Sequence, residues 1–309
     1  MRAFLAVPLL ALALAAGCGK GSDAGGRELT AVATTTQVAD LVRSVGGDRV
    51  EVRGLVQQAA DPHGYEPRPS DARAVADAAV VFRSGGELDA WLDDLLSNAG
   101  DDVPEVSLIE SVRTIEVDGE PDPHWWQDPR NAVLAVEAIR DGLAEADPGG
   151  RAEYERNAAD YSARLRALDR SIAACIARVP VEQRKLITTH DSFGYFARRY
   201  GIEVIGALIP SLSTQAQPSA KDTLELVEQI ERAGAKAIFP ESALNPKLEE
   251  AVAREAEAEV GDALWADSLG PEGSDGETYV EALASDAASM VEGFSGGEVR
   301  CRPGTRRAG

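Results

Sequence analysis

The stretch Asp122-Pro123-His124-Trp125-Trp126-Gln127-Asp128-Pro129 places one histidine between two Asp-Pro steps. Proline fixes its own φ and restricts the residue before it, so the two steps predict a short, rigid loop that presents the imidazole in one direction. The chain has only three histidines, and the other two lie in comparable settings: Asp61-Pro62-His63-Gly64-Tyr65-Glu66-Pro67 and Thr188-Thr189-His190-Asp191-Ser192-Phe193-Gly194-Tyr195-Phe196. One such histidine alone would more simply be structural, but all three together favour a shared metal site.

Alternating strand and helix patterns flank this stretch and predict an α/β fold in two lobes, each with a roughly four-stranded parallel sheet. In the first lobe we expect strands at residues 29–34, 50–56, 79–83 and 105–109 and helices at 37–45, 70–78 and 87–98. In the second we expect strands at 185–189, 203–209, 235–239 and 262–266 and helices at 192–200, 219–233, 246–259 and 277–292.

Residues 151–178 lie between the two sets and predict one long helix. Apolar side chains recur there every three or four residues, no glycine or proline interrupts the run, and Pro180 follows its end. At the standard rise such a helix spans roughly 42 Å. An ordinary peripheral helix would fit the pattern, but the length and position favour a connector that ties the lobes together.

The first 17 residues carry one charge, at Arg2, and an apolar run that is too short to span a bilayer stably, which is typical of an export signal. Leu14-Ala15-Ala16-Gly17-Cys18 resembles a bacterial lipoprotein processing box, in which Cys18 receives lipid and becomes the first mature residue. The alternative is a secreted protein with an incidental cysteine at that position. Residues 18–27, rich in small and polar types, are expected to form a flexible tether.

Removal of the signal leaves 30 basic residues against 52 acidic ones, a net charge of −22. Nucleic acid is therefore excluded as a partner, because phosphate binding needs basic patches. The acidic residues are spread along the chain, so the charge is explained by solubility and is compatible with a cationic ligand.

Ligands of open parallel sheets bind beyond the carboxyl ends of the strands. His63 and His190 follow predicted strands, and so does Asp267 in Leu264-Trp265-Ala266-Asp267-Ser268-Leu269-Gly270. Together with His124 they would give three imidazoles and one carboxylate, a tetrahedral set that suits Zn²⁺. From spacing alone, a helix N-cap explains Asp267 equally well.

Five motifs taken in order resemble the zinc/manganese-binding lipoproteins of ABC-type metal importers, the solute-binding subunits also called the adhesin-lipoprotein family. The motifs are Asp-Pro-His-Gly-Tyr-Glu-Pro at 61–67, Asp-Pro-His-Trp-Trp-Gln-Asp-Pro at 122–129, Thr-His-Asp-Ser-Phe-Gly-Tyr-Phe at 189–196, Phe239-Pro240-Glu241 and Ala266-Asp267-Ser268-Leu269-Gly270. The resemblance implies two α/β lobes joined by a long helix, with one metal ion between them held by His63, His124, His190 and Asp267.

It also implies Zn²⁺ or Mn²⁺ as cargo, ABC permease subunits as membrane partners, a monomer anchored through Cys18 on the outer face of the cytoplasmic membrane, and no enzymatic activity. We therefore divide the chain into residues 1–17 (signal), 18–27 (tether), 28–150 (first lobe), 151–179 (connecting helix), 180–296 (second lobe) and 297–309 (flexible tail). Zinc-binding relatives often carry a histidine-rich loop before the second ligand, whereas residues 116–122 here are short, acidic and free of histidine.

Ligating imidazoles usually donate their second N–H to a carboxylate or carbonyl. Candidates for this role are Glu66, Asp128, Asp191 and Glu241.

The rival functional class, a zinc-dependent hydrolase, would use the three histidines as zinc ligands and Glu241 or Asp191 as general base. A fourth protein ligand would close the position that catalytic zinc keeps for water, and no His-Glu-x-x-His motif is present. A surface adhesin is a third class, but it gives no reason for gathering ligands.

The remaining cysteines, Cys175 and Cys301, leave two alternatives open. In an oxidising compartment they could join the connecting helix to the tail, or both could stay unpaired.

Overall fold

The computed structural model describes residues 29–100, 103–117 and 119–304. The predicted signal, Cys18 and the predicted tether lie outside this range. Among the residues described, no helix is both long enough and apolar enough to cross a membrane.

The first lobe is built on a parallel four-stranded sheet in the order β2-β1-β3-β4. The inner strand β1 has the largely apolar sequence Leu-Thr-Ala-Val-Ala, which suits a strand covered on both faces. The strands are β1 (Leu29–Ala33), β2 (Val50–Gly54), β3 (Val80–Arg83) and β4 (Glu105–Ser107), and the helices are α1 (Thr36–Gly46), α2 (Pro69–Ala76), α3 (Leu92–Ala99) and α4 (Pro129–Ala146). A two-stranded hairpin, β5 (Glu116–Val117) with β6 (Glu120–Pro121), precedes the His124 loop.

Two parts of this lobe differ from the sequence-based expectation. The helix predicted at 87–98 is divided into the 3-10 turn η2 (Gly86–Asp89) and α3. The turn directs the buried carboxylate of Asp89 inward, where it accepts hydrogen bonds from the amides of Ser84 and Gly85 and the hydroxyl of Thr34. The helix α4 was not predicted, although Asp128 as N-cap and Pro129 as first helical residue mark its start.

The second lobe pairs its strands less extensively. Strand β7 (Lys185–His190) runs parallel to β8 (Glu203–Ile209), β9 (Ala237–Ile238) runs parallel to β10 (Glu259–Val260), and one bridge between Thr188 and Phe239 connects the two ladders. The helices are α6 (Gly194–Tyr200), α7 (Ala220–Ala233), α8 (Lys247–Glu255) and α9 (Tyr279–Ser295).

The strand predicted at 262–266 is reduced to a single bridge between Leu264 and Glu241. The next residue, Trp265, donates its amide N–H to the side chain of Asp286 instead of to a neighbouring strand. The parallel ladder therefore ends before it reaches the Asp267 loop.

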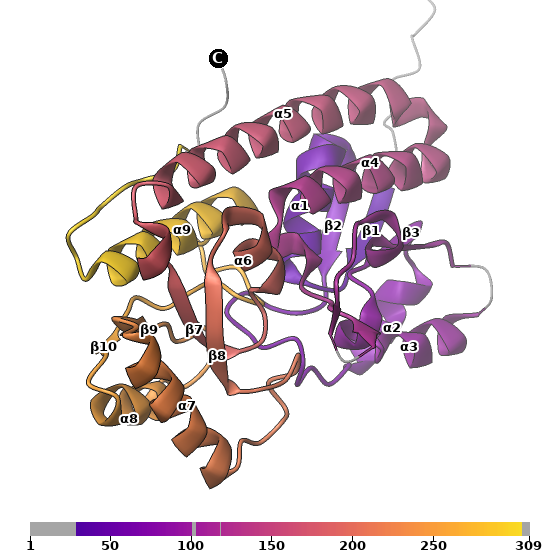
Figure 1. The fold of residues 1–309 in the computed structure, drawn as a ribbon. Coiled ribbons are helices and arrows are strands. Elements are labelled where there is room, and N and C mark those ends of the chain that lie inside the picture. The colour runs from indigo at the N-terminus through magenta and orange to yellow at the C-terminus, as the bar shows by residue number, and fades with distance from the viewer. Residues whose placement is uncertain (1–28, 101–102, 118, 305–309) are drawn as a thin grey trace, which may run out of the picture.

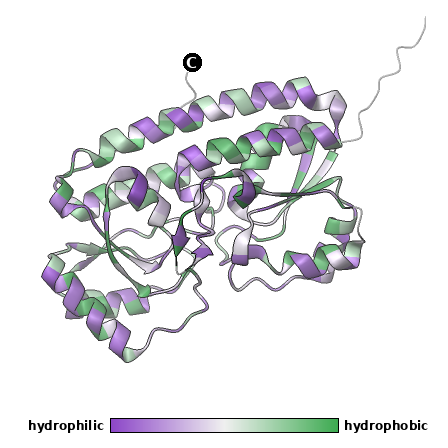
Figure 2. Cartoon of the chain, turned by 45° about the vertical axis from the view of Figure 1, so that its right-hand side comes forward, coloured by the Kyte–Doolittle hydropathy of each residue, from purple (hydrophilic) through white to green (hydrophobic). Residues whose placement is uncertain are grey.

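The predicted connecting helix is α5 (Arg151–Ile176), which lies across both lobes (Figure 1). Hydrophilic and hydrophobic residues alternate along it (Figure 2), and its apolar positions are buried against α4, α1 and α9. The largest hydrophobic cluster runs from Val38 and Val136 through Leu165 on α5 to Phe239 and Met290. The two lobes thus share one core.

The cysteine alternatives are resolved in favour of a disulfide. Cys175 near the end of α5 is bonded to Cys301, with 5.8 Å between the Cα atoms. Two hydrogen bonds accompany it, from Arg178 to the carbonyl of Arg300 (2.7 Å) and from the amide of Gly304 to the hydroxyl of Ser171 (2.8 Å). Residues 297–304 of the predicted flexible tail are therefore held against α5.

Candidate metal centre

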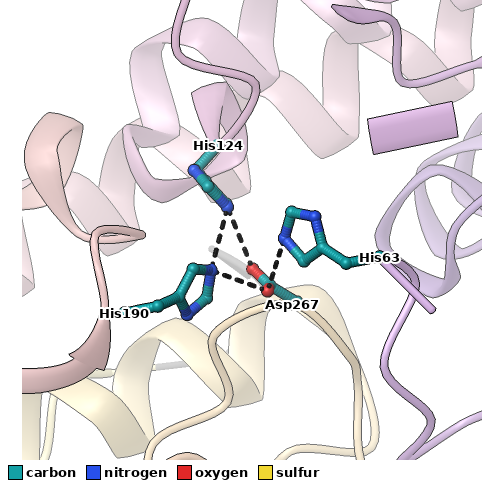
Figure 3. Close-up of side chains that lie close together, drawn as sticks. All are labelled: His63, His124, His190 and Asp267. Atoms are coloured by element: carbon teal, nitrogen blue, oxygen red, sulfur yellow. Dashed lines mark hydrogen bonds and ion pairs between the residues drawn. The ribbon is translucent and has the colours of Figure 1, made fainter. Parts of the chain in front are cut away.

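Three imidazoles surround one carboxylate between the lobes (Figure 3). His63, His124, His190 and Asp267 each offer one ligand atom, and these atoms all lie within 4.8 Å of one another. The Nε2 atoms of His63 and His190 lie 3.2 and 3.1 Å from Oδ2 of Asp267, and that of His124 lies 3.5 Å from Oδ1. The imidazoles of His124 and His190 are 0 % exposed and that of His63 is 5 % exposed, so the centre is shielded from water.

Each of these residues is placed by the end of a regular element. His63 lies in the loop after β2, His190 is the last residue of β7, and Asp267 follows the bridge residue Leu264. His124 directly precedes the 3-10 turn η4 (Trp125–Gln127), which leads into α4. The four side chains that the sequence analysis selected are therefore brought together by the carboxyl ends of strands and one helix entrance, as the parallel topology predicts.

The centre contains buried polar atoms that make no hydrogen bond. They are Nε2 of His63 and both carboxylate oxygens of Asp267. Contact distances without hydrogen-bond geometry leave these atoms unsatisfied, which is costly in a buried site. A cation among them would accept the carboxylate and the imidazole lone pairs at once, so the arrangement fits a metal ion.

Two carboxylates lie behind the imidazoles and orient them. Oδ1 of Asp122 lies 2.8 Å from Nδ1 of His124 and also accepts that residue's amide N–H. Oε1 of Glu241 lies 2.7 Å from Nδ1 of His190 and accepts the His190 amide in the same way. A proton held on Nδ1 leaves Nε2 as the free donor atom that faces the centre.

The four carboxylates predicted for this role have different positions. Glu241 contacts the imidazole of His190, as described above. Asp128 caps α4 and forms an ion pair with Arg130, Glu66 is exposed, and the amide of Asp191 donates to the carbonyl of Ser211.

The partner of His124 is Asp122, which sequence reasoning missed. The sequence did contain a pattern that indicates this role. The Asp-Pro step places a carboxylate two residues before the histidine, where it can accept a hydrogen bond from the backbone N–H of that histidine.

The Asp267 loop is fixed from the first lobe. Its carbonyl at Ala266 accepts hydrogen bonds from the indole N–H of Trp126 (2.9 Å) and the side-chain amide of Gln127 (3.0 Å), both in η4. The same turn that follows His124 therefore also sets the backbone next to Asp267. Two candidate ligands, His124 and Asp267, are therefore held by one turn although they lie far apart in the sequence.

The electrostatics of the centre follow from its burial and its charges. Burial alone would raise the pKa of Asp267, but His190 and His124 hold it well below the usual value. Burial alone would lower the pKa of His190, but the charges of Asp267 and Glu241 raise it well above the usual value. Burial raises the pKa of Glu241, although His190 opposes the shift. The centre therefore attracts positive charge.

Comparison with known proteins gives relatives over nearly the whole chain. The manganese-binding lipoprotein MntA of Halalkalibacterium halodurans is 33 % identical over 287 residues, which cover 91 % of this chain and 95 % of the relative. The periplasmic zinc-binding protein TroA of Treponema pallidum has a similar fold, with a TM-score of 0.82 and 28 % identity over 86 % of this chain and 99 % of TroA.

A manganese-bound periplasmic metal-binding protein from Candidatus Liberibacter asiaticus is also similar. Its TM-score is 0.78 at 25 % identity, and the match covers 86 % of this chain and 99 % of the relative.

The family described as zinc-uptake complex component A, periplasmic, matches residues 31–293, a range that includes all four residues of the centre. By that match and by its fold, this chain belongs to the family of extracytoplasmic metal-binding proteins that serve ABC importers.

Proposed function

We propose that this protein captures one divalent transition-metal ion per chain at His63, His124, His190 and Asp267 and delivers it to ABC permease subunits in the membrane. Zn²⁺ is the preferred cargo in this proposal, and the protein acts as a monomer. The observation that supports it best is the convergence of three imidazole Nε2 atoms on the buried, unsatisfied carboxylate of Asp267.

The choice of zinc rests on the donor atoms. Imidazole nitrogen suits zinc well, whereas manganese is a harder ion that gains relatively more from carboxylate oxygen and higher coordination numbers. Manganese is the second candidate, because relatives include a manganese-binding lipoprotein and a manganese-bound structure beside the zinc-binding TroA.

Catalysis is not part of the proposal. The family consists of binding proteins and not enzymes. The geometry agrees, because a fourth protein ligand takes the position that a hydrolytic zinc needs for water.

A competition titration tests both the metal site and its selectivity. The wild type should bind one zinc ion per chain and prefer zinc to manganese. His190→Glu adds a second carboxylate to the centre, so zinc affinity should fall more than manganese affinity does, and the ratio of the two affinities should drop about tenfold or more. Both proteins are titrated with the two ions at one fixed pH.

The conservative variant Glu66→Gln serves as control, since Glu66 is exposed and its ratio should equal that of the wild type. A ratio that stays the same or rises in His190→Glu would remove the argument for zinc. A wild type without stoichiometric metal would reject the proposed function itself.

The lipid anchor is a separate part of the proposal. Cys18 precedes the residues that the structure describes, and the metal centre begins far along the chain at His63. Cys18→Ser should therefore release the protein from the membrane fraction and leave its metal affinity unchanged. Fractionation of cells with an antibody against the folded part decides this, and a variant that stays in the membrane pellet would contradict lipidation at Cys18.

A further inference from the structure

A loop of the second lobe contacts the loop of the first lobe that carries His63. Residues 210–217, which we call the clasp loop, follow β8 and lead toward α7. Near its start, the carbonyl of Ser211 accepts the amide N–H of Asp191, the residue after His190 (3.0 Å). Further along, the hydroxyl of Thr214 donates to Oδ2 of Asp61 in the opposite lobe (2.6 Å).

The two carboxylate oxygens of Asp61 accept hydrogen bonds from different lobes. Oδ1 accepts the backbone N–H of His63 at 2.9 Å, and Oδ2 accepts the Thr214 hydroxyl. A continuous series of hydrogen bonds and backbone therefore connects the segment that carries His190 with the loop that carries His63.

The clasp loop also packs closely on the His63 loop. A Cβ atom placed on Gly64 would lie 3.0 Å from the side-chain amide of Gln215, which shows how near the two segments are. His63 is the only one of the four residues that is not fully buried. The clasp loop thus lies against the loop that carries His63, the least buried of the four candidate ligands.

We propose that Asp61 and Thr214 are positioning residues that form a clasp between the lobes, and that opening this clasp controls the rate at which metal exchanges. The inference rests on the proposed function and deepens it. When the clasp is closed, Asp61 holds the backbone of His63 in its ligating position. When the hydrogen bond between Thr214 and Asp61 breaks, the His63 loop is free to move away from the other three ligands.

The size of the effect follows from the kind of hydrogen bond. A hydroxyl that donates to a carboxylate makes a charge-assisted bond, which is stronger than a neutral one. If it breaks before the ion leaves, its removal should accelerate release by about 10- to 100-fold. The association rate should change little or increase, because an open clasp does not obstruct access.

Thr214→Val removes the hydroxyl and keeps the side-chain shape. The matched control is Thr223→Val, whose hydroxyl donates to the carbonyl of Ser219 within the second lobe. Thr214→Ser restores the donor and should restore slow release. Release of zinc from each full-length protein into excess chelator is followed by stopped flow, and association is measured separately with zinc alone.

The expected result is fast release in Thr214→Val only, with unchanged one-to-one zinc binding. Equal release rates in all four proteins, or a faster rate in Thr223→Val as well, would overturn the clasp. A wild type that binds no zinc would instead defeat the proposed function, so the two failures are distinguishable. Asp61→Ala adds a second measurement: release should be at least as fast as in Thr214→Val, because it also frees the His63 amide.

Discussion

Replacing Asp267 by asparagine should weaken zinc binding about 100- to 1,000-fold. Four ligands of a structural zinc site together supply about 10–16 kcal/mol, so one ligand corresponds to roughly 2.5–4 kcal/mol. Asp267 carries the only formal negative charge among the four and lies within 3.5 Å of all three imidazoles. Asparagine keeps the shape of the side chain and removes the charge, so the loss reports coordination and not a cavity. Competition against a chelator of known affinity measures it.

Variants of two neighbouring carboxylates provide a comparison for the loss of zinc affinity in Asp267→Asn. Asp122→Asn removes the acceptor behind His124 and should cost about 10- to 100-fold in affinity, the usual effect of a group that orients a ligand. Asp128→Asn should leave the affinity unchanged, because Asp128 serves α4 and Arg130. If Asp128→Asn weakened binding as much as Asp122→Asn, the assignment of the carboxylates around His124 would be wrong.

Zinc should stabilise the fold by about 4.1 kcal/mol when its free concentration is a thousandfold above the dissociation constant. This gain should depend strongly on pH. The ion needs neutral imidazoles, and a raised pKa means that His190 keeps its proton in the metal-free protein to higher pH than an ordinary histidine. The gain should therefore fall toward zero near pH 5 and still increase above pH 7, where an ordinary histidine with a pKa of about 6.5 would already be neutral.

In the metal-free protein, the contribution of His190 to the stability of the fold should instead decrease as pH rises. A folded-state pKa above the unfolded one stabilises the fold fully below the unfolded value, and the stabilisation is lost as pH rises through the folded value. Melting temperatures of chelator-treated and zinc-buffered protein between pH 5 and 9 measure both trends. In His190→Asn the gain should be smaller and should level off at lower pH. A zinc-induced shift that is constant over this range would contradict a shared site in which His190 exchanges a proton for metal.

The sequence was sufficient to select the four side chains that meet in the candidate metal centre, because few residues in the chain could serve as such ligands. Three histidines, each next to a proline or at the end of a strand pattern, leave few alternatives, and the parallel topology explains why they meet. Asp267 was ambiguous from spacing, because an N-cap carboxylate and a ligand carboxylate look alike in sequence. In the structure the next helix begins at Tyr279 with Thr278 as its N-cap, and the carboxylate of Asp267 lies within 3.5 Å of the three Nε2 atoms, as the ligand interpretation requires.

Other features depend on contacts that no local pattern encodes. The segment 262–266 has the pattern of a strand, but the backbone of Trp265 is bonded to the buried side chain of Asp286 on α9. The segment 87–98 has the pattern of one helix, but Asp89 is needed as an acceptor in the core. The hydrogen bond between Asp61 and Thr214 joins residues 153 positions apart, so it emerges only when the lobes are assembled.

The bond between Cys175 and Cys301 closes a covalent ring of the chain, with a sequence separation of 126 between its two ends. The ring contains the whole second lobe, whose sheet is held by short ladders and single bridges. Because Cys301 follows α9, the last helix of that lobe, the ring closes only after the second lobe has been synthesised and exported. Oxidation is then a late maturation step, and a single proteolytic cut inside the ring would leave both pieces of the lobe attached to α5.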